Sequence, residues 1–66
     1  MKISLNGQTR EVAPGTTLSQ LVAGLSLGGL KVAVERNFNI VPREQFDATV
    51  LAEGDRLEVV TFVGGG

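Results

Sequence analysis

Residues 2–25, KISLNGQTREVAPGTTLSQLVAGL, hold a predicted β-hairpin that leads directly into a predicted helix. In the first strand Ile3 and Leu5 alternate with polar residues, which is the period-two pattern of a half-buried strand. Asn6-Gly7 is typical of a type I′ turn, because both central residues of that turn need a positive φ. We therefore expect a second, antiparallel strand that runs from Gln8 to Ala13.

The helix is predicted from its first turn and from its apolar spacing. Thr17 and Gln20 fit a capping box, in which each side chain accepts from the other residue's backbone N–H. Four apolar residues fall at i, i+3, i+4 and i+7 and so share one helix face: Leu18, Leu21, Val22 and Leu25. Gly24 suggests a close approach of helix to sheet, and Gly28-Gly29 are expected to end the helix.

Three further extended segments follow the helix. LKVAVE (30–35) is nearly all apolar and suits a central strand, whereas Pro42 makes IVPRE (40–44) an edge strand or a connector. RLEVVTFV (56–63) is the last strand, and the segment before it supplies Val50 and Leu51 to the core. This order predicts an α+β fold of the β-grasp type, a mixed sheet of about four strands packed on one amphipathic helix. We expect residues 1–63 to form this domain and residues 64–66 to be a flexible glycine tail.

Composition excludes several classes of function. The 66 residues include no cysteine and no histidine, so thiolate catalysis, disulfides and the commonest metal ligands are absent. The net charge of −1 comes from interspersed charges, which argues against nucleic-acid binding. No apolar run is long enough to span a membrane and no signal peptide is evident, so we expect a cytoplasmic protein. Composition also predicts no bound cofactor or metal and no enzyme activity of its own.

The end of the sequence, TFVGGG, carries its most distinctive chemical group, the carboxylate of Gly66. Glycines permit close backbone approach, and Gly64, Gly65 and Gly66 together reach about 10 Å at roughly 3.3–3.6 Å per residue. That length suits threading into a partner's active site. A carboxylate is a poor acyl electrophile and needs prior activation, for example as an acyl-adenylate. The alternative is an inert, disordered end.

The last strand also offers a docking surface. Alternation places Leu57, Val59 and Val63 inward and puts Val60 and Phe62 on the opposite face, next to the tail. We interpret Val60 and Phe62 as candidate partner-docking residues; the alternative is that a loop covers them. The acidic residues of this region, Glu53, Asp55 and Glu58, are interpreted as solvated charges around a turn; the alternative is an acidic cluster near the tail that steers docking to a basic partner surface.

Three segments carry a family resemblance: VAVERN (32–37), IVPRE (40–44) and EGDRLEVVTFVGGG (53–66). With the short length, they resemble the ubiquitin-like sulfur carriers, and most closely the thiamine-biosynthesis sulfur carrier family, ThiS. Phe46 is a mild departure, since this family often has tryptophan there.

The resemblance implies a reaction sequence centred on Gly66. A ubiquitin-activating-enzyme-like adenylyltransferase would adenylate the carboxylate with ATP and magnesium. A sulfurtransferase or cysteine desulfurase would supply the sulfur of a thiocarboxylate, and thiazole synthase would receive it. The alternatives are a carrier for another pathway (molybdopterin-type), a ubiquitin-like protein modifier joined to lysines, and a plain binding module.

Overall fold

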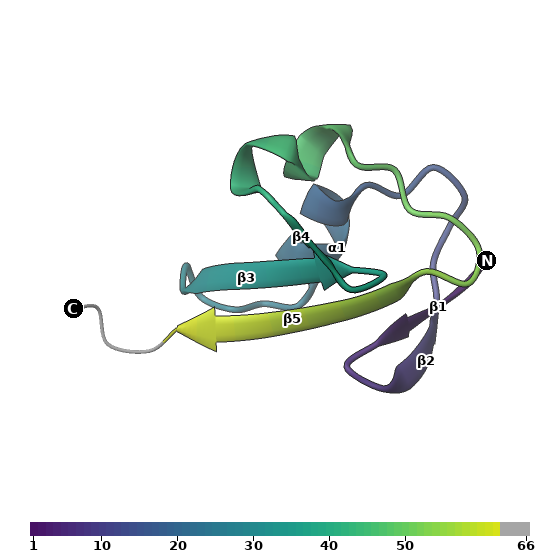
Figure 1. Cartoon of the computed structure of the whole chain (residues 1–66), viewed down its shortest axis with the longest axis horizontal. Coiled ribbons are helices and arrows are strands. Elements are labelled where there is room, and N and C mark those ends of the chain that lie inside the picture. The colour runs from purple at the N-terminus through teal and green to yellow at the C-terminus, as the bar shows by residue number, and fades with distance from the viewer. Residues whose placement is uncertain (63–66) are drawn as a thin grey trace.

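The computed structural model describes residues 1–62 as one mixed, five-stranded sheet with both helical segments on the same side of it (Figure 1). In chain order the elements are β1 (Lys2–Leu5), β2 (Gln8–Glu11), α1 (Leu18–Gly24), β3 (Lys31–Arg36), β4 (Asn39–Val41), the 3₁₀ helix η1 (Arg43–Ala48) and β5 (Arg56–Phe62). The strand order is β2-β1-β5-β3-β4, with β5 parallel to β1 and all other pairs antiparallel. This confirms the predicted β-grasp layout, with β4 as the fifth strand and an edge strand.

The first hairpin forms as its turn residues predict. Asn6 and Gly7 have φ of 51° and 82°, the left-handed values that a type I′ turn requires. The turn sets the register, in which Leu5 lies opposite Gln8. Every residue of β2 is exposed, so this edge strand contributes little to the core beyond its pairing with β1.

Helix α1 begins as predicted and ends earlier than predicted. Thr17 N–H donates to Gln20 Oε1 at 2.9 Å and Gln20 N–H donates to Thr17 Oγ1 at 3.2 Å, which completes the capping box. The helix ends at Gly24, before Gly28-Gly29, because Ser26 takes a left-handed φ of 55° that a helix cannot continue through. A Cβ built on Gly24 meets nothing within 4 Å, so the predicted close approach to the sheet was wrong.

The core lies between the sheet and its helical layer, on what we call the inner face of the sheet. Leu18 and Leu57 are 0% exposed and form its centre. Within residues 1–62 the buried apolar residues are Ile3, Leu5, Leu18, Leu21, Val34, Phe46, Leu51 and Leu57. Leu51 is buried as predicted, but Val50 is 52% exposed, so its assignment to the core was wrong. Val50 instead makes an isolated bridge to Thr17, and its neighbour in sequence fills the core.

Candidate functional site

Strand β5 is the central strand and the element that leads to the tail. Its start is paired on both sides, since Arg56 and Leu57 lie opposite Ser4 and Leu5 of β1, and Leu57 also lies opposite Arg36 of β3. The Asn6 side chain extends this pairing: its Oδ1 accepts from Val59 N–H at 2.8 Å and its Nδ2 donates to Val59 O at 3.2 Å. Beyond Val59, β5 pairs with β3 alone among residues 1–62.

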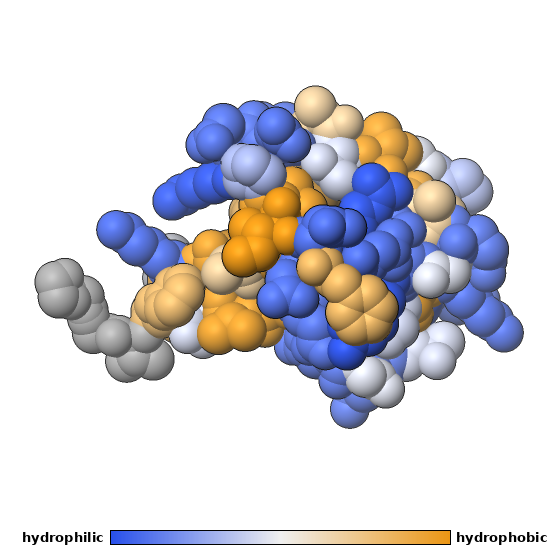
Figure 2. Space-filling view, viewed as in Figure 1, coloured by the Kyte–Doolittle hydropathy of each residue, from blue (hydrophilic) through white to orange (hydrophobic). Residues whose placement is uncertain are grey.

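Val60 and Phe62 lie on the outer face of the sheet, opposite the helices, as alternation predicted. Their side chains are 55% and 57% exposed, so within residues 1–62 no loop covers them. Across the β3–β5 ladder, Val60 is opposite Ala33 and Phe62 is opposite Lys31. Figure 2 shows hydrophobic side chains at the left, over the end of β5, and mostly hydrophilic ones over its start. Their role in docking stays a prediction.

Gly64, Gly65 and Gly66, the predicted reactive tail, lie outside the described residues, as does Val63. The predicted boundary between residues 63 and 64 lies there too. The structure therefore shows how the strand that leads to the tail is held, and which surface surrounds the last described residue, Phe62.

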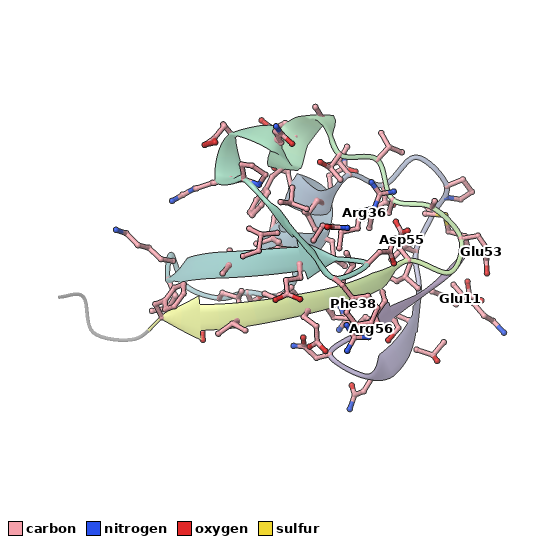
Figure 3. All side chains as sticks on the ribbon, viewed as in Figure 1. Glu11, Arg36, Phe38, Glu53, Asp55 and Arg56 are labelled. Atoms are coloured by element: carbon pink, nitrogen blue, oxygen red, sulfur yellow. The ribbon has the colours of Figure 1, made fainter. Side chains whose placement is uncertain are left out.

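The opposite end of β5 is held by a buried carboxylate that the sequence analysis interpreted wrongly. Asp55 is 5% exposed and accepts from Arg36 Nε at 2.9 Å, Asn37 Nδ2 at 3.0 Å and Ala52 N–H at 2.8 Å (Figure 3). Burial by itself would raise the pKa of Asp55, but the hydrogen bonds from Ala52, Asn37 and Arg36 outweigh it and lower the pKa below its ordinary value of 3.8. Asp55 is thus a structural anchor that joins β3, β5 and the turn before β5.

Glu53 and Glu58 also differ from the predicted group of solvated charges. Glu53 Oε1 accepts from Lys2 N–H at 2.9 Å, and Glu58 pairs with Arg56 at 2.9 Å. Glu53 and Asp55 precede β5, so they lie at the end of the strand remote from Phe62. Of these three acidic residues, only Glu58 lies on the outer face near Val60.

The β3–β4 turn holds a feature that the sequence analysis missed. Asn37 and Phe38 have φ of 51° and 72°, and a left-handed φ is unusual for phenylalanine. Phe38 is 73% exposed, and the Arg56 guanidinium carbon lies 4.4 Å from the centre of its ring (Figure 3). Asn37, the first residue of this turn, is a residue that tolerates such φ values, but nothing in the sequence pairs Phe38 with Arg56. Phe46, the mild departure from the family pattern, is buried instead.

Residues 1–62 hold no candidate metal centre. They include no cluster of three or more potential metal-binding side chains. A cavity of about 340 Å³ lies between α1, η1 and the start of β3, where Val22, Leu30 and Phe46 line it together with Arg43. No helix in the described part is long and apolar enough to cross a membrane.

Comparisons with known proteins agree on one family. The model of the ThiS family matches residues 3–66. The sulfur carrier protein ThiS of Bacillus subtilis is 37% identical over 97% of this chain and 98% of its own length. A crystal structure of the thiamine biosynthesis protein ThiS from Geobacter metallireducens superposes with a TM-score of 0.83 at 35% identity, over 100% of both chains.

A longer relative is also similar. A thiazole synthase of Magnetococcus marinus is 52% identical over the whole of this chain, which spans 20% of that protein's length. The match over residues 3–66, together with the full-length relatives, shows that the chain belongs to the ThiS family.

Proposed function

We propose that this chain is a sulfur carrier for thiamine biosynthesis and that Gly66 is the residue that carries the sulfur. The observation that carries this proposal is family membership through a relative of nearly equal length whose name is sulfur carrier protein ThiS. The composition agrees with a carrier acted on by enzymes, since the chain has no cysteine or histidine with which to catalyse acyl chemistry.

The proposed chemistry proceeds in two steps at the Gly66 carboxylate. A carboxylate oxygen attacks the α-phosphorus of ATP and pyrophosphate leaves, which gives an acyl-adenylate. A sulfurtransferase or cysteine desulfurase carries the sulfur as a persulfide, and a thiol reductant releases it at the sulfide level by forming a disulfide. This sulfur attacks the acyl carbon, AMP leaves with the former carboxylate oxygen, and the thiocarboxylate remains on Gly66. ATP and magnesium belong to the adenylating partner, a ubiquitin-activating-enzyme-like adenylyltransferase, and we propose the cytoplasm as the place where these substrates are available.

Thiazole synthase is the proposed acceptor of the sulfur. Support comes from the thiazole synthase of Magnetococcus marinus, a longer protein in which a segment similar to this whole chain is present. The presence of such a segment within a thiazole synthase favours contact between the carrier and the synthase.

Strand β5 has two roles in this proposal. Its anchored start keeps the strand in place, and its exposed end presents Val60 and Phe62 to the partner beside the tail. Glycines suit the tail because they fit a narrow channel and adopt any backbone conformation. Docking through the outer face would bring the Gly66 carboxylate into the partner's active site.

Intact-mass spectrometry tests the proposal after incubation with ATP, magnesium, the adenylating partner and a sulfur source. We expect the mass increment for one oxygen replaced by sulfur, mapped to the C-terminal peptide and sensitive to alkylation. That mapping separates it from oxidation of Met1. A variant that lacks Gly65 and Gly66 serves as the control and should fold normally while gaining no sulfur.

Two outcomes would redirect the proposal. AMP formation without sulfur gain, combined with lysine-linked conjugates, would favour the protein-modifier function. Full function of the variant without Gly65 and Gly66 would favour a binding module with an inert end.

A further inference from the structure

The outer face of the sheet carries two glutamates directly opposite each other. Glu35 of β3 pairs in register with Glu58 of β5, and both side chains are half-buried. Side chains in such cross-strand positions have Cβ atoms about 4.5–5.5 Å apart, and like charges placed there destabilise a sheet. The free protein therefore holds an unfavourable charge pair on the face that leads to the tail.

Of the two glutamates, only Glu58 has an ion-pair partner within residues 1–62. Arg56 Nη2 donates to Glu58 Oε1 at 2.9 Å, and the same guanidinium covers the ring of Phe38. Within residues 1–62, no ion pair involves Glu35. Arg36 of this ladder pairs with Asp55, and Lys31 lies opposite Phe62, separated from the glutamates by the Ala33–Val60 pair.

Exposed apolar side chains flank the glutamates on both sides. Ile40 of β4 lies opposite Glu35 and is 70% exposed. On the tail side, Val60 and Phe62 follow Glu58 along β5, at alternate positions of the same face. The outer face therefore presents negative charge bordered by apolar surface, which is complementary to a positive side chain set among apolar ones.

We propose that this face docks a protein that presents an arginine or lysine between Glu35 and Glu58, with apolar side chains beside it on Val60 and Phe62. The inference rests on the proposed function, because the protein that docks on this face is identified as the adenylating partner. The basic side chain would neutralise the like-charged pair on docking. Charge complementarity of this kind contributes to partner choice and to the rate of association.

The first test uses the free protein and the matched variants Glu35→Lys and Glu44→Lys. Glu44 is an exposed residue of η1, on the helical side of the sheet, so it makes a charge-matched control. Because a lysine at 35 would face Glu58, we expect Glu35→Lys to raise the Tm by about 1–5 °C relative to Glu44→Lys. A fall in Tm would contradict the like-charge premise and overturn the proposal.

The second test titrates the whole chain with the peptide acetyl-Leu-Arg-Leu-amide and follows backbone amide shifts by NMR. We expect the shifts to concentrate at residues 33–35 and 58–60, and the apparent affinity to fall about 3- to 10-fold in Glu35→Lys and to stay unchanged in Glu44→Lys. Equal binding of acetyl-Leu-Glu-Leu-amide, or shifts confined to the helical layer, would overturn the proposal.

The third test measures the release of pyrophosphate when the adenylating partner acts on the carrier with ATP and magnesium. We expect Glu35→Lys to raise the KM for the carrier about 3- to 10-fold with kcat unchanged, while Glu44→Lys behaves as wild type. An unchanged KM would overturn the proposed docking and leave the sulfur-carrier function intact. If the wild-type chain releases no pyrophosphate, the proposed function fails, and the peptide titration alone decides the chemistry of this face. If Glu35→Lys raises the Tm and weakens binding, the loss of binding comes from the docking surface and not from misfolding.

Discussion

The two ends of β5 differ sharply, although they belong to one central strand. At its start, β5 has hydrogen-bonded neighbours on both sides, and the residue before it, Asp55, accepts three hydrogen bonds in a nearly buried site. At its end only β3 pairs with it within the described residues, and Val60 and Phe62 are more than half exposed. One strand thus combines a rigid attachment with an accessible surface.

The comparison shows how a domain of this size can leave apolar side chains exposed. A short chain buries a small share of its surface and depends on each core contact. Here the buried side chains lie on the inner face and at Asp55, and the outer side chains at the end of β5 are exposed. Mutations at the two ends should therefore separate stability from function.

The largest expected effect is at the anchored end. Asp55→Ala removes a buried carboxylate and leaves Arg36, Asn37 and the Ala52 N–H without their acceptor, so the free energy of unfolding should fall by about 3 kcal/mol. Urea unfolding followed by circular dichroism measures it. Glu53→Ala, at an exposed residue with one hydrogen bond, is the control and should cost less than half as much. Equal losses would show that the Asp55 network is not the anchor.

A smaller effect is expected when the pH is lowered. Because the pKa of Asp55 is lowered in the folded state, its carboxylate stabilises the fold fully above the unfolded value of 3.8 and loses that contribution as the pH falls through the folded value. The urea midpoints of wild type and Asp55→Asn should therefore differ most near neutral pH and converge below about pH 3.8. If the difference between the two urea midpoints stays constant down to pH 2, the pKa of Asp55 is not lowered in the folded state.

The smallest effect on stability is expected at the exposed end. Val60→Ser should change the free energy of unfolding by no more than about 0.5 kcal/mol, because an exposed side chain loses few contacts. Val50→Ser is a close control, since Val50 and Val60 are 52% and 55% exposed. Both variants should unfold alike, but only Val60→Ser should slow the release of pyrophosphate with the adenylating partner. If Val50→Ser slows the reaction equally, the outer face is not the docking surface.

Local sequence patterns were sufficient for the fold and for most of its elements. The Asn6-Gly7 turn, the Thr17–Gln20 capping box and the alternation of β5 were all confirmed, because each depends on residues close together in the chain. Predictions about packing were less successful. Gly24 has no close neighbour, and Val50 is exposed while Leu51 is buried, because these outcomes depend on how η1 and α1 meet the sheet.

By itself, the sequence determined the order of elements, the β-grasp layout, the face of the sheet on which Val60 and Phe62 lie, and the family through its C-terminal segments. These follow from periodicity and turn chemistry, which act over a few residues. Only the tertiary structure decided that Asp55 is a buried anchor, that Phe38 meets Arg56, and that Glu35 faces Glu58. Each of these contacts joins segments brought together by strand register, and register is set by the pairing of whole strands rather than by any one segment.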